Sequence, residues 1–134
     1  MDNLTKEQRR KNMQHIRSTG TLPERMIMAE LRRLNIYFAS NVSAIEGKPD
    51  IVFRRKKVLV FIDSDFWHGH PTRCKMPKSN VTYWKKKIAR NSNRDRQVTL
   101  SLRQKGWKVI RLWEYDITHG FAKSIKRILN AIGK

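Results

Sequence analysis

The apolar run Val58–Ile62 is the feature that most constrains the fold of this chain. A short continuous apolar run bounded by polar residues is typical of a buried strand, and we expect one over Lys57–Asp63. A second strand is predicted over Asp50–Phe53, joined to the first by a short basic turn. A sheet therefore stands at the centre of the predicted fold.

Helix signals lie on both sides of these strands. Thr5–Gln8 has the form of a capping box and predicts a basic helix to about Arg17. Pro23 lies inside the first turn of a second predicted helix that ends near Asn35. Its buried stripe is assigned to Leu22, Met26, Ala29, Leu31 and Leu34. The remaining predicted elements are strands over Ile36–Val42 and Trp107–Trp113, a helix over Asn80–Gln104, and a last helix capped by Thr118.

This order of elements predicts an α/β protein, a single three-layer α/β/α domain with a central mixed β-sheet. The domain is expected to span residues 1–134, with residues 1–20 as an N-terminal basic helix or arm and residues 21–134 as the catalytic core. No repeat and no low-complexity linker divides the chain.

The charge of the chain indicates a polyanionic partner. Thirty Lys and Arg against eleven Asp and Glu give a net charge of +19. The excess lies mainly in the second half, where Asp95 is the only acid between Phe66 and Trp113. A solvated basic face is the plain alternative, but so one-sided a charge favours contacts with DNA phosphates.

Other compositional features narrow the location and chemistry. No apolar run approaches the roughly 20 residues that a membrane-spanning helix needs, so we expect no membrane partner. The simplest location is the cytoplasm, where the DNA lies if the source is bacterial. Cys74 is the single cysteine, which rules out an internal disulfide and a zinc site made of cysteines alone. We expect a monomer.

Two carboxylates mark a candidate metal centre. Asp50 begins one predicted strand and Asp63 ends the next, so chain reversal between them would bring the two together. Mg²⁺ prefers oxygen ligands, commonly one or two carboxylates with water and substrate supplying the rest. The pattern Pro49-Asp50 followed by Asp63-Ser64-Asp65 is similar to that of PD-(D/E)xK nucleases, although the lysine of that motif is missing.

A narrower resemblance extends over most of the chain. The matching segments are Arg10–Met13, Pro23-Glu24, Gly47–Val52, Val60–Asp63, Phe66–His70, Trp84, Lys87-Ile88, Asn91, Asn93–Arg96, Gly106–Val109 and Trp113-Glu114. Together they resemble the very-short-patch repair (Vsr) endonucleases. The resemblance implies a restriction-endonuclease-like fold and a Mg²⁺-dependent enzyme that nicks one strand beside the thymine of a T·G mismatch. Its partners would be mismatched double-stranded DNA and other repair proteins.

The same resemblance assigns roles to individual residues. Asp50 would bind the metal with the backbone carbonyl of Ile62, and Asp63 is a candidate second ligand. His68 would be the general acid/base, with Glu24 supporting the water network near it. The further catalytic and DNA-binding assignments are Asp95 as an active-site acid, Phe66, Trp67 and Trp84 as aromatics that wedge into the mismatch, and Arg10, Lys11, Asn12, Lys85, Lys87, Arg94 and Arg96 as DNA contacts.

One part of the family pattern is missing from this sequence. The family often carries a structural zinc site, but the positions expected to hold Cys are here Asp65, Thr72 and Tyr115. Asp65, His70 and Cys74 make a poor set of zinc ligands, so we expect no structural Zn²⁺. The loop would then be held by packing or by direct pairing of Asp65 with His70.

Each assignment has a plainer alternative. Asp50 and Asp63 could be solvated or capping residues, and Asp95 could pair with arginines of its own helix. Trp84 could be a core residue, and an isolated histidine such as His68 is more often structural. For the whole protein, the alternatives are a restriction or mobile-element endonuclease of the same fold acting on other DNA, and a non-catalytic DNA-binding module.

Overall fold

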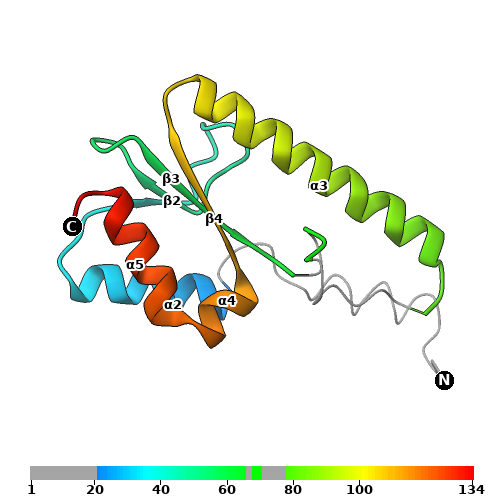
Figure 1. The fold of residues 1–134 in the computed structure, drawn as a ribbon, viewed down its shortest axis with the longest axis horizontal. Coiled ribbons are helices and arrows are strands. Elements are labelled where there is room, and N and C mark those ends of the chain that lie inside the picture. Colours follow the sequence, from blue (N-terminus) through cyan, green and yellow to red (C-terminus); the bar gives the residue numbers. More distant parts are fainter. Residues whose placement is uncertain (1–20, 66–67, 71–77) are drawn as a thin grey trace.

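The structure, a computed structural model, describes residues 21–65, 68–70 and 78–134. The helices and strands in chain order are α2 (Leu22–Arg33), β1 (Ala39–Ser40), β2 (Ile51–Phe53), β3 (Val58–Asp63), α3 (Val81–Gln104), β4 (Lys108–Trp113), α4 (Glu114–His119) and α5 (Phe121–Ala131) (Figure 1). The helix and arm predicted for residues 1–20 lie outside the described residues.

The four strands form one mixed sheet in the order β1-β2-β3-β4. β1 pairs with β2, and β2 with β3, in antiparallel orientation, whereas β3 and β4 are parallel. A parallel pair needs a long crossover connection, and here α3 supplies it. Asp63 lies opposite Trp113, so the carboxyl ends of β3 and β4 meet at one edge of the sheet. The prediction of a mixed sheet flanked by helices is confirmed.

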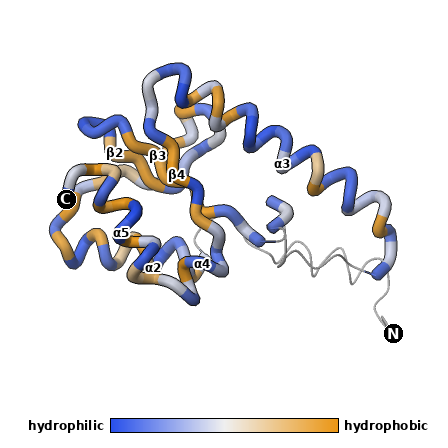
Figure 2. The backbone as a smooth tube through the Cα atoms, viewed as in Figure 1, coloured by the Kyte–Doolittle hydropathy of each residue, from blue (hydrophilic) through white to orange (hydrophobic). Residues whose placement is uncertain are grey.

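Helices cover both faces of the sheet. On one face, side chains of α2, α4 and α5 such as Ile27, Ile117 and Ile128 pack against apolar residues of β2, β3 and β4. On the other face, Leu102 of α3 packs against Leu59 of β3 and the neighbouring strand residues. Figure 2 shows the apolar strands between these helices, and shows that the half of α3 beyond the sheet is mainly hydrophilic.

The buried stripe predicted for α2 is correct at Leu31 but wrong at Leu22 and Leu34. Leu22 and Leu34 are 59% and 37% exposed, whereas Ile27, Met28 and Leu31 are buried. The true stripe also contains Glu24, which is only 2% exposed. The buried face of a helix is predicted from the spacing of its apolar residues. The charge of Glu24 interrupts that spacing, so another face of α2 was predicted to be buried.

Two other element boundaries differ from prediction. The strand predicted over Ile36–Val42 is limited to Ala39–Ser40, because Asn41 turns away with a positive φ. Thr118 does not cap the last helix; it lies in α4, and its hydroxyl donates to backbone carbonyls of Glu114 and Tyr115. The additional helix α4 follows β4 directly and places Glu114 at its first turn. Among the described residues, no helix is long and apolar enough to cross a membrane.

Candidate active site

His68 lies between the two strand ends and α3. Its Nδ1 atom is hydrogen-bonded to Oδ2 of Asp95 and lies 3.8 Å from Oδ1 of Asp63. Asp63 ends β3, and Asp95 comes from the middle of α3, so three separate segments meet at one imidazole. Burial lowers the pKa of His68, but the hydrogen bond with Asp95 and the charge of Asp63 outweigh burial and raise it overall.

The turn that carries His68 is pressed against α3. Gly69 has φ of +68°, and a Cβ atom there would stand 2.6 Å from Cγ2 of Ile88. Ser92 of α3 donates from its hydroxyl to the backbone carbonyl of His68 at 2.9 Å. A residue with a side chain is strained at such a φ and has no room here, so Gly69 permits the close approach. The local sequence thus fixes His68 against the helix that holds Asp95.

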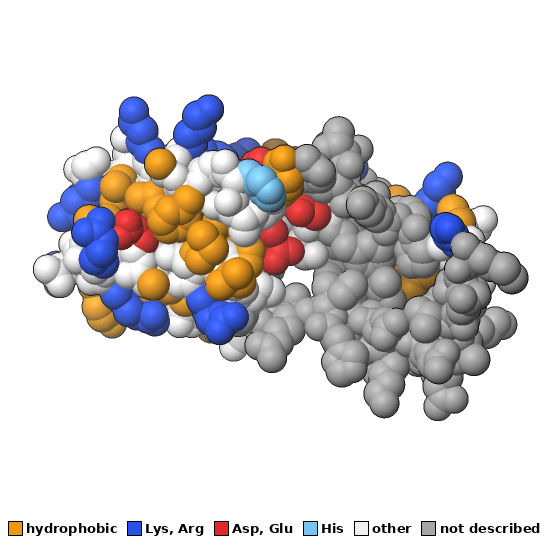
Figure 3. Space-filling view, turned by 90° about the horizontal axis from the view of Figure 1, so that it is seen from below, with side chains coloured by type: hydrophobic (Ala, Val, Ile, Leu, Met, Phe, Trp, Pro, Cys, Tyr) orange, Lys and Arg blue, Asp and Glu red, His pale blue; other side chains and the backbone are white. Residues whose placement is uncertain are grey.

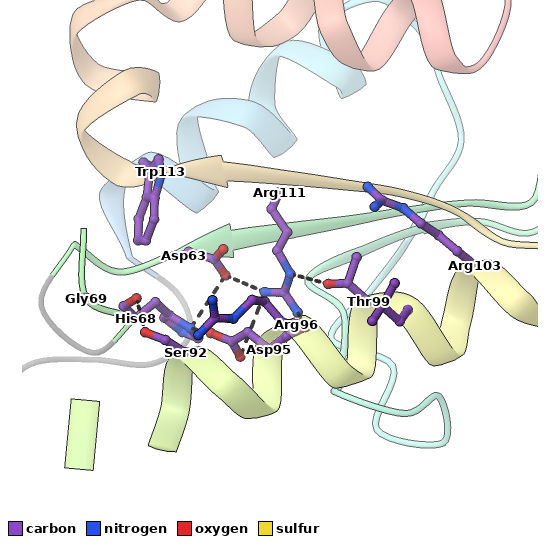
Figure 4. Close-up of a pocket in the computed structure, with 11 residues that line it drawn as sticks. Asp63, His68, Gly69, Ser92, Asp95, Arg96, Thr99, Arg103, Arg111 and Trp113 are labelled. Atoms are coloured by element: carbon purple, nitrogen blue, oxygen red, sulfur yellow. Dashed lines mark hydrogen bonds and ion pairs between the residues drawn. The ribbon is translucent and has the colours of Figure 1, made fainter. Parts of the chain in front are cut away.

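Arg111 is the central cation of the site, although no sequence motif predicts a role for it. Its guanidinium donates to Oδ1 of Asp63 at 2.8 Å from Nη1 and to the hydroxyl of Thr99 at 2.8 Å from Nε. Nη2 lies 3.4 Å from the backbone carbonyl of Asp95. The alternation of side chains along β4 places Arg111 on the α3 face (Figure 4). An arginine inside an otherwise apolar strand was the sequence signal for a buried carboxylate partner.

Asp50 lies next to β3, as the predicted chain reversal required. Its Oδ2 atom accepts a hydrogen bond of 2.6 Å from the backbone N–H of Ile62. Burial raises the pKa of Asp50 to about 7, with further increases from the charges of Glu24 and Asp63, against the opposing hydrogen bond from Ile62. Glu24, from the first turn of α2, is therefore part of the electrostatic environment of Asp50, and all three carboxylates are buried.

This group of carboxylates suits a divalent cation. Buried acids that repel one another favour either a proton or a metal ion, and hard cations such as Mg²⁺ select carboxylate and carbonyl oxygens. The described residues contain no group of three or more His, Cys, Asp or Glu side chains arranged to hold a metal ion. Mg²⁺ needs fewer, since it commonly binds through one or two carboxylates and completes its shell with water and substrate oxygens.

The residues considered as remnants of a zinc site have other contacts. Oδ1 of Asp65 accepts a hydrogen bond of 3.4 Å from the backbone N–H of Tyr115. The backbone N–H of His70 donates to the carbonyl oxygen of Asp65, and the His70 ring packs edge-on against Trp113 at 4.7 Å between centroids. Cys74 lies outside the described residues. The described part of the loop is thus attached to the strand end by packing and backbone hydrogen bonds.

The predicted DNA-binding residues fall into two groups. Trp84, Lys85, Lys87, Arg94 and Arg96 all lie on α3. Trp84 packs edge-on against Tyr83, with the Lys87 ammonium 5.7 Å from its ring centre, near the end of α3 that extends beyond the sheet (Figure 1). The others predicted, Phe66, Trp67, Arg10, Lys11 and Asn12, lie outside the described residues.

An open pocket of about 520 Å³ lies beside His68 (Figure 4). Its lining includes both acids that face the imidazole, together with Arg96, Arg103 and Arg111. Carboxylates therefore stand next to cations at one place, while elsewhere on the surface Lys and Arg project outward (Figure 3). Such a site can exchange a proton with a bound group and hold an anionic oxygen close by.

Comparison with known proteins identifies the relatives of this chain. The sequence model of the family described as "DNA mismatch endonuclease Vsr" matches residues 1–75. The chain is 38% identical to the type II nicking enzyme V.NmeDIP of Neisseria meningitidis serogroup C, over 98% of this chain and 90% of that protein. It is 41% identical to the type II nicking enzyme V.NaeI of Lentzea aerocolonigenes, over 81% and 68%.

A further relative is the DNA mismatch endonuclease Vsr of Escherichia coli strain K12, which is 31% identical over 81% of this chain and 70% of that protein. The family match covers more than half of the chain and includes the segment around Asp50 and Asp63. These likenesses confirm the family expected from the sequence motifs and imply a divalent metal ion. The chain belongs to the Vsr family and is a DNA strand-nicking endonuclease.

Proposed function

We propose that this protein is a Mg²⁺-dependent endonuclease that nicks one DNA strand next to the thymine of a T·G mismatch and thereby initiates short-patch repair. The observation that carries the proposal is the contact of His68 with Asp95 and Asp63, beside the buried carboxylate of Asp50. A proton-transfer group thus lies next to a group of oxygen donors suited to a cation. The domain is proposed to have a restriction-endonuclease-like fold over residues 1–134.

The carboxylate of Asp50 and the backbone carbonyl of Ile62 would hold the metal. When bound, Mg²⁺ polarises the scissile phosphate and lowers the pKa of the attacking water. Asp63 remains a candidate ligand from the sequence, but its Oδ1 atom already accepts a hydrogen bond from Arg111. We therefore place Asp63 with His68. Glu24 is assigned to the water network near His68, and its charge also raises the pKa of Asp50.

His68 would act as the general acid/base. The carboxylate of Asp95 beside Nδ1 favours a proton on that nitrogen, which leaves Nε2 to exchange a proton with water or with the leaving oxygen of the DNA. Asp95 orients the imidazole and stabilises its protonated form, as a buried acid does in hydrolases that use a histidine base. A general acid/base of this kind contributes about 10²- to 10⁴-fold to a rate.

Recognition of the mismatch is assigned to Phe66, Trp67 and Trp84. An apolar or aromatic wedge costs a few kcal/mol of base stacking, and a mismatched step costs least to open. Trp84 lies near the projecting end of α3, and this position supports the assignment. We assign the neighbouring Lys85 and Lys87 to phosphate contacts. The family description and the name of the Escherichia coli relative both specify a mismatch endonuclease, which supports this substrate.

The test is a nicking assay on two duplexes that differ only by a T·G pair, each with Mg²⁺ and with EDTA. We expect the mismatched duplex to be nicked in Mg²⁺ but not in EDTA, and the paired duplex not to be nicked. His68→Gln should lower the nicking rate by about 100-fold or more. Lys123→Ala, an exposed change on α5, is the matched control and should nick normally. Equal cleavage of paired and mismatched duplexes would refute the mismatch assignment.

A second candidate is an endonuclease of the same fold that nicks other DNA, such as a restriction or mobile-element enzyme. Several relatives are named type II nicking enzymes, which supports this alternative. A survey of cleavage sites on long, fully paired DNA distinguishes the two. Nicks at a fixed paired sequence, with no preference for T·G, would favour the alternative.

A further inference from the structure

Arg111 links the elements that surround His68. It comes from β4, contacts Asp63 at the end of β3, and reaches Thr99 and the backbone of Asp95 on α3. The guanidinium carbon also lies 4.2 Å above the ring centre of Phe61, so its plane is supported from below. Arginine is suited to such a place because its planar group presents several donors in a fixed arrangement.

We propose that Arg111 is a positioning residue of the nicking reaction, which holds Asp63 and α3 in the arrangement that keeps His68 Nδ1 on Asp95 and leaves Nε2 for the substrate. This inference rests on the role of His68 proposed above. Arg111 is not assigned a contact with the DNA or with the reacting atoms.

The geometry explains why a cation is needed at this position. Asp63 and Asp95 both face Nδ1 of His68, and Asp63 is 5% exposed. Without a cation beside it, the carboxylate of Asp63 would compete with Asp95 for Nδ1 of the imidazole. Arg111 neutralises Asp63 at 2.8 Å, so that Asp95 remains the principal partner of the imidazole. Arg111 also opposes the increase in the pKa of His68 that the two acids cause.

The charged groups around His68 come from each neighbouring element. Asp63 faces it from β3, Asp95 from α3 and Arg111 from β4, while Arg96 lines the same pocket. Asp50 also interacts with His68 electrostatically. Removal of the Arg111 charge therefore leaves an excess of carboxylates, and the protonated imidazole becomes more stable.

The experiment compares Arg111→Met and Arg111→Lys with the full-length enzyme in steady-state nicking assays from pH 6 to 10. For Arg111→Met we expect kcat to fall about 100-fold at pH 7, with KM changed less than about 3-fold, and the acidic limb of the pH profile to move upward. For Arg111→Lys the acidic limb of the pH profile should stay near its original pH, because the positive charge remains. Its kcat should fall about 10-fold, because lysine lacks the planar set of N–H donors of arginine.

Two controls separate the possible outcomes. Arg127→Met removes a guanidinium that donates to the backbone carbonyl of Arg111 from an exposed position on α5, and it should leave kcat and the pH profile unchanged. Melting temperatures identify a variant that has lost its fold; if Arg111→Met does not fold, Arg111→Lys carries the test through its loss of kcat at constant KM.

Wild-type kcat and an unshifted pH limb in a folded Arg111→Met would overturn the inference. The inference would also be overturned if Arg111→Met and Arg111→Lys lost the same amount of kcat and if these losses were explained by their lower melting temperatures. His68→Gln, measured in parallel, tests the proposed function separately. If His68→Gln is inactive while Arg111→Met is normal, Arg111 alone has been misassigned; if His68→Gln nicks normally, the role of His68 is wrong.

Discussion

Replacement of Asp50 by asparagine should stabilise the metal-free protein while abolishing nicking. Burial, together with repulsion from Glu24 and Asp63, raises the pKa of Asp50 from 3.8 to about 7, although the hydrogen bond from Ile62 opposes the increase. A charge that is so unfavourable in the folded protein does not stabilise the fold, which supports the proposed role of Asp50 in binding a cation.

The magnitude follows from the pKa shift. Each pKa unit corresponds to about 1.4 kcal/mol, so ionised Asp50 destabilises the folded, metal-free protein by roughly 4 kcal/mol above pH 7. Asparagine has the same shape and can still accept the N–H of Ile62, but burial of its amide group without a full set of partners costs about 1 to 2 kcal/mol. We expect Asp50→Asn to be about 2 kcal/mol more stable at pH 8, which raises Tm by roughly 6 to 10 °C.

The sign of the pH dependence is also determined. Between about pH 4 and 7 the folded protein retains a proton on Asp50 that the unfolded chain has released, so wild-type stability falls as pH rises through this window. Asp50→Asn has no titrating group at this position, so its stability lacks this dependence on pH. The difference in the free energy of unfolding between the two proteins should therefore be smallest below about pH 4, where Asp50 becomes protonated in the unfolded chain as well, and should grow toward pH 8.

The assay is urea unfolding in EDTA at pH 4.5, 6 and 8, followed by circular dichroism. Asp116→Asn, a change at an exposed acid of α4, is the matched control and should stay within about 0.5 kcal/mol of the wild type. Added Mg²⁺ should raise Tm of the wild type but not of Asp50→Asn. An Asp50→Asn variant that is less stable than the wild type at pH 8, or parallel curves of stability against pH for the two proteins, would contradict this prediction.

The remaining predictions concern the histidine loop, its acid partner and α3. Gly69→Ala should lower the free energy of unfolding by about 2 to 4 kcal/mol, measured in urea, and should lower the nicking rate, because the added Cβ meets Ile88 at 2.6 Å. Its control, Gly133→Ala, has a similar φ but open space around the Cβ, and should lower the free energy of unfolding by about 1 kcal/mol. Asp95→Asn should reduce kcat by about 10²- to 10⁴-fold with little change in KM, and an unchanged kcat would contradict the assigned pair. A double Lys85→Ala and Lys87→Ala variant should flatten the slope of log affinity against log salt by roughly 1 to 2, measured by fluorescence anisotropy on duplex DNA. An unaltered slope would remove these lysines from the phosphate contacts.

The parts of the site that depend on nearby residues could be predicted from the sequence. The chain reversal after Phe53 brings Asp50 beside Ile62 because a hairpin joins neighbouring segments, and the pattern of two apolar runs around a basic turn specifies it. The long helix and the last strand were also predicted within a residue or two, since Gly106 separates them.

The parts that depend on distant contacts could not be predicted. Glu24 is buried on the apolar face of α2. Because a charged residue interrupts the hydrophobic spacing of that face, the spacing predicted a different face as the buried one. Arg111 has no motif of its own, and its role becomes visible only when the pairing of β3 with β4 places it beside Asp63. The preference of a charged side chain for a buried partner is physical, but the identity of that partner is set by the tertiary fold.

The parallel pairing of β3 with β4 has a consequence for the order in which the residues of the candidate site are synthesised and brought together. Asp63 and Arg111 are 48 residues apart in the chain, with all of α3 between them. On the ribosome, the carboxylates are therefore synthesised well before the strand that organises them, and domains fold as units once their sequence has emerged. The growing polypeptide carries the acids and the histidine without the strand that completes their arrangement. The contact between Arg111 and Asp63 can form only after β4 has been made and has paired with β3.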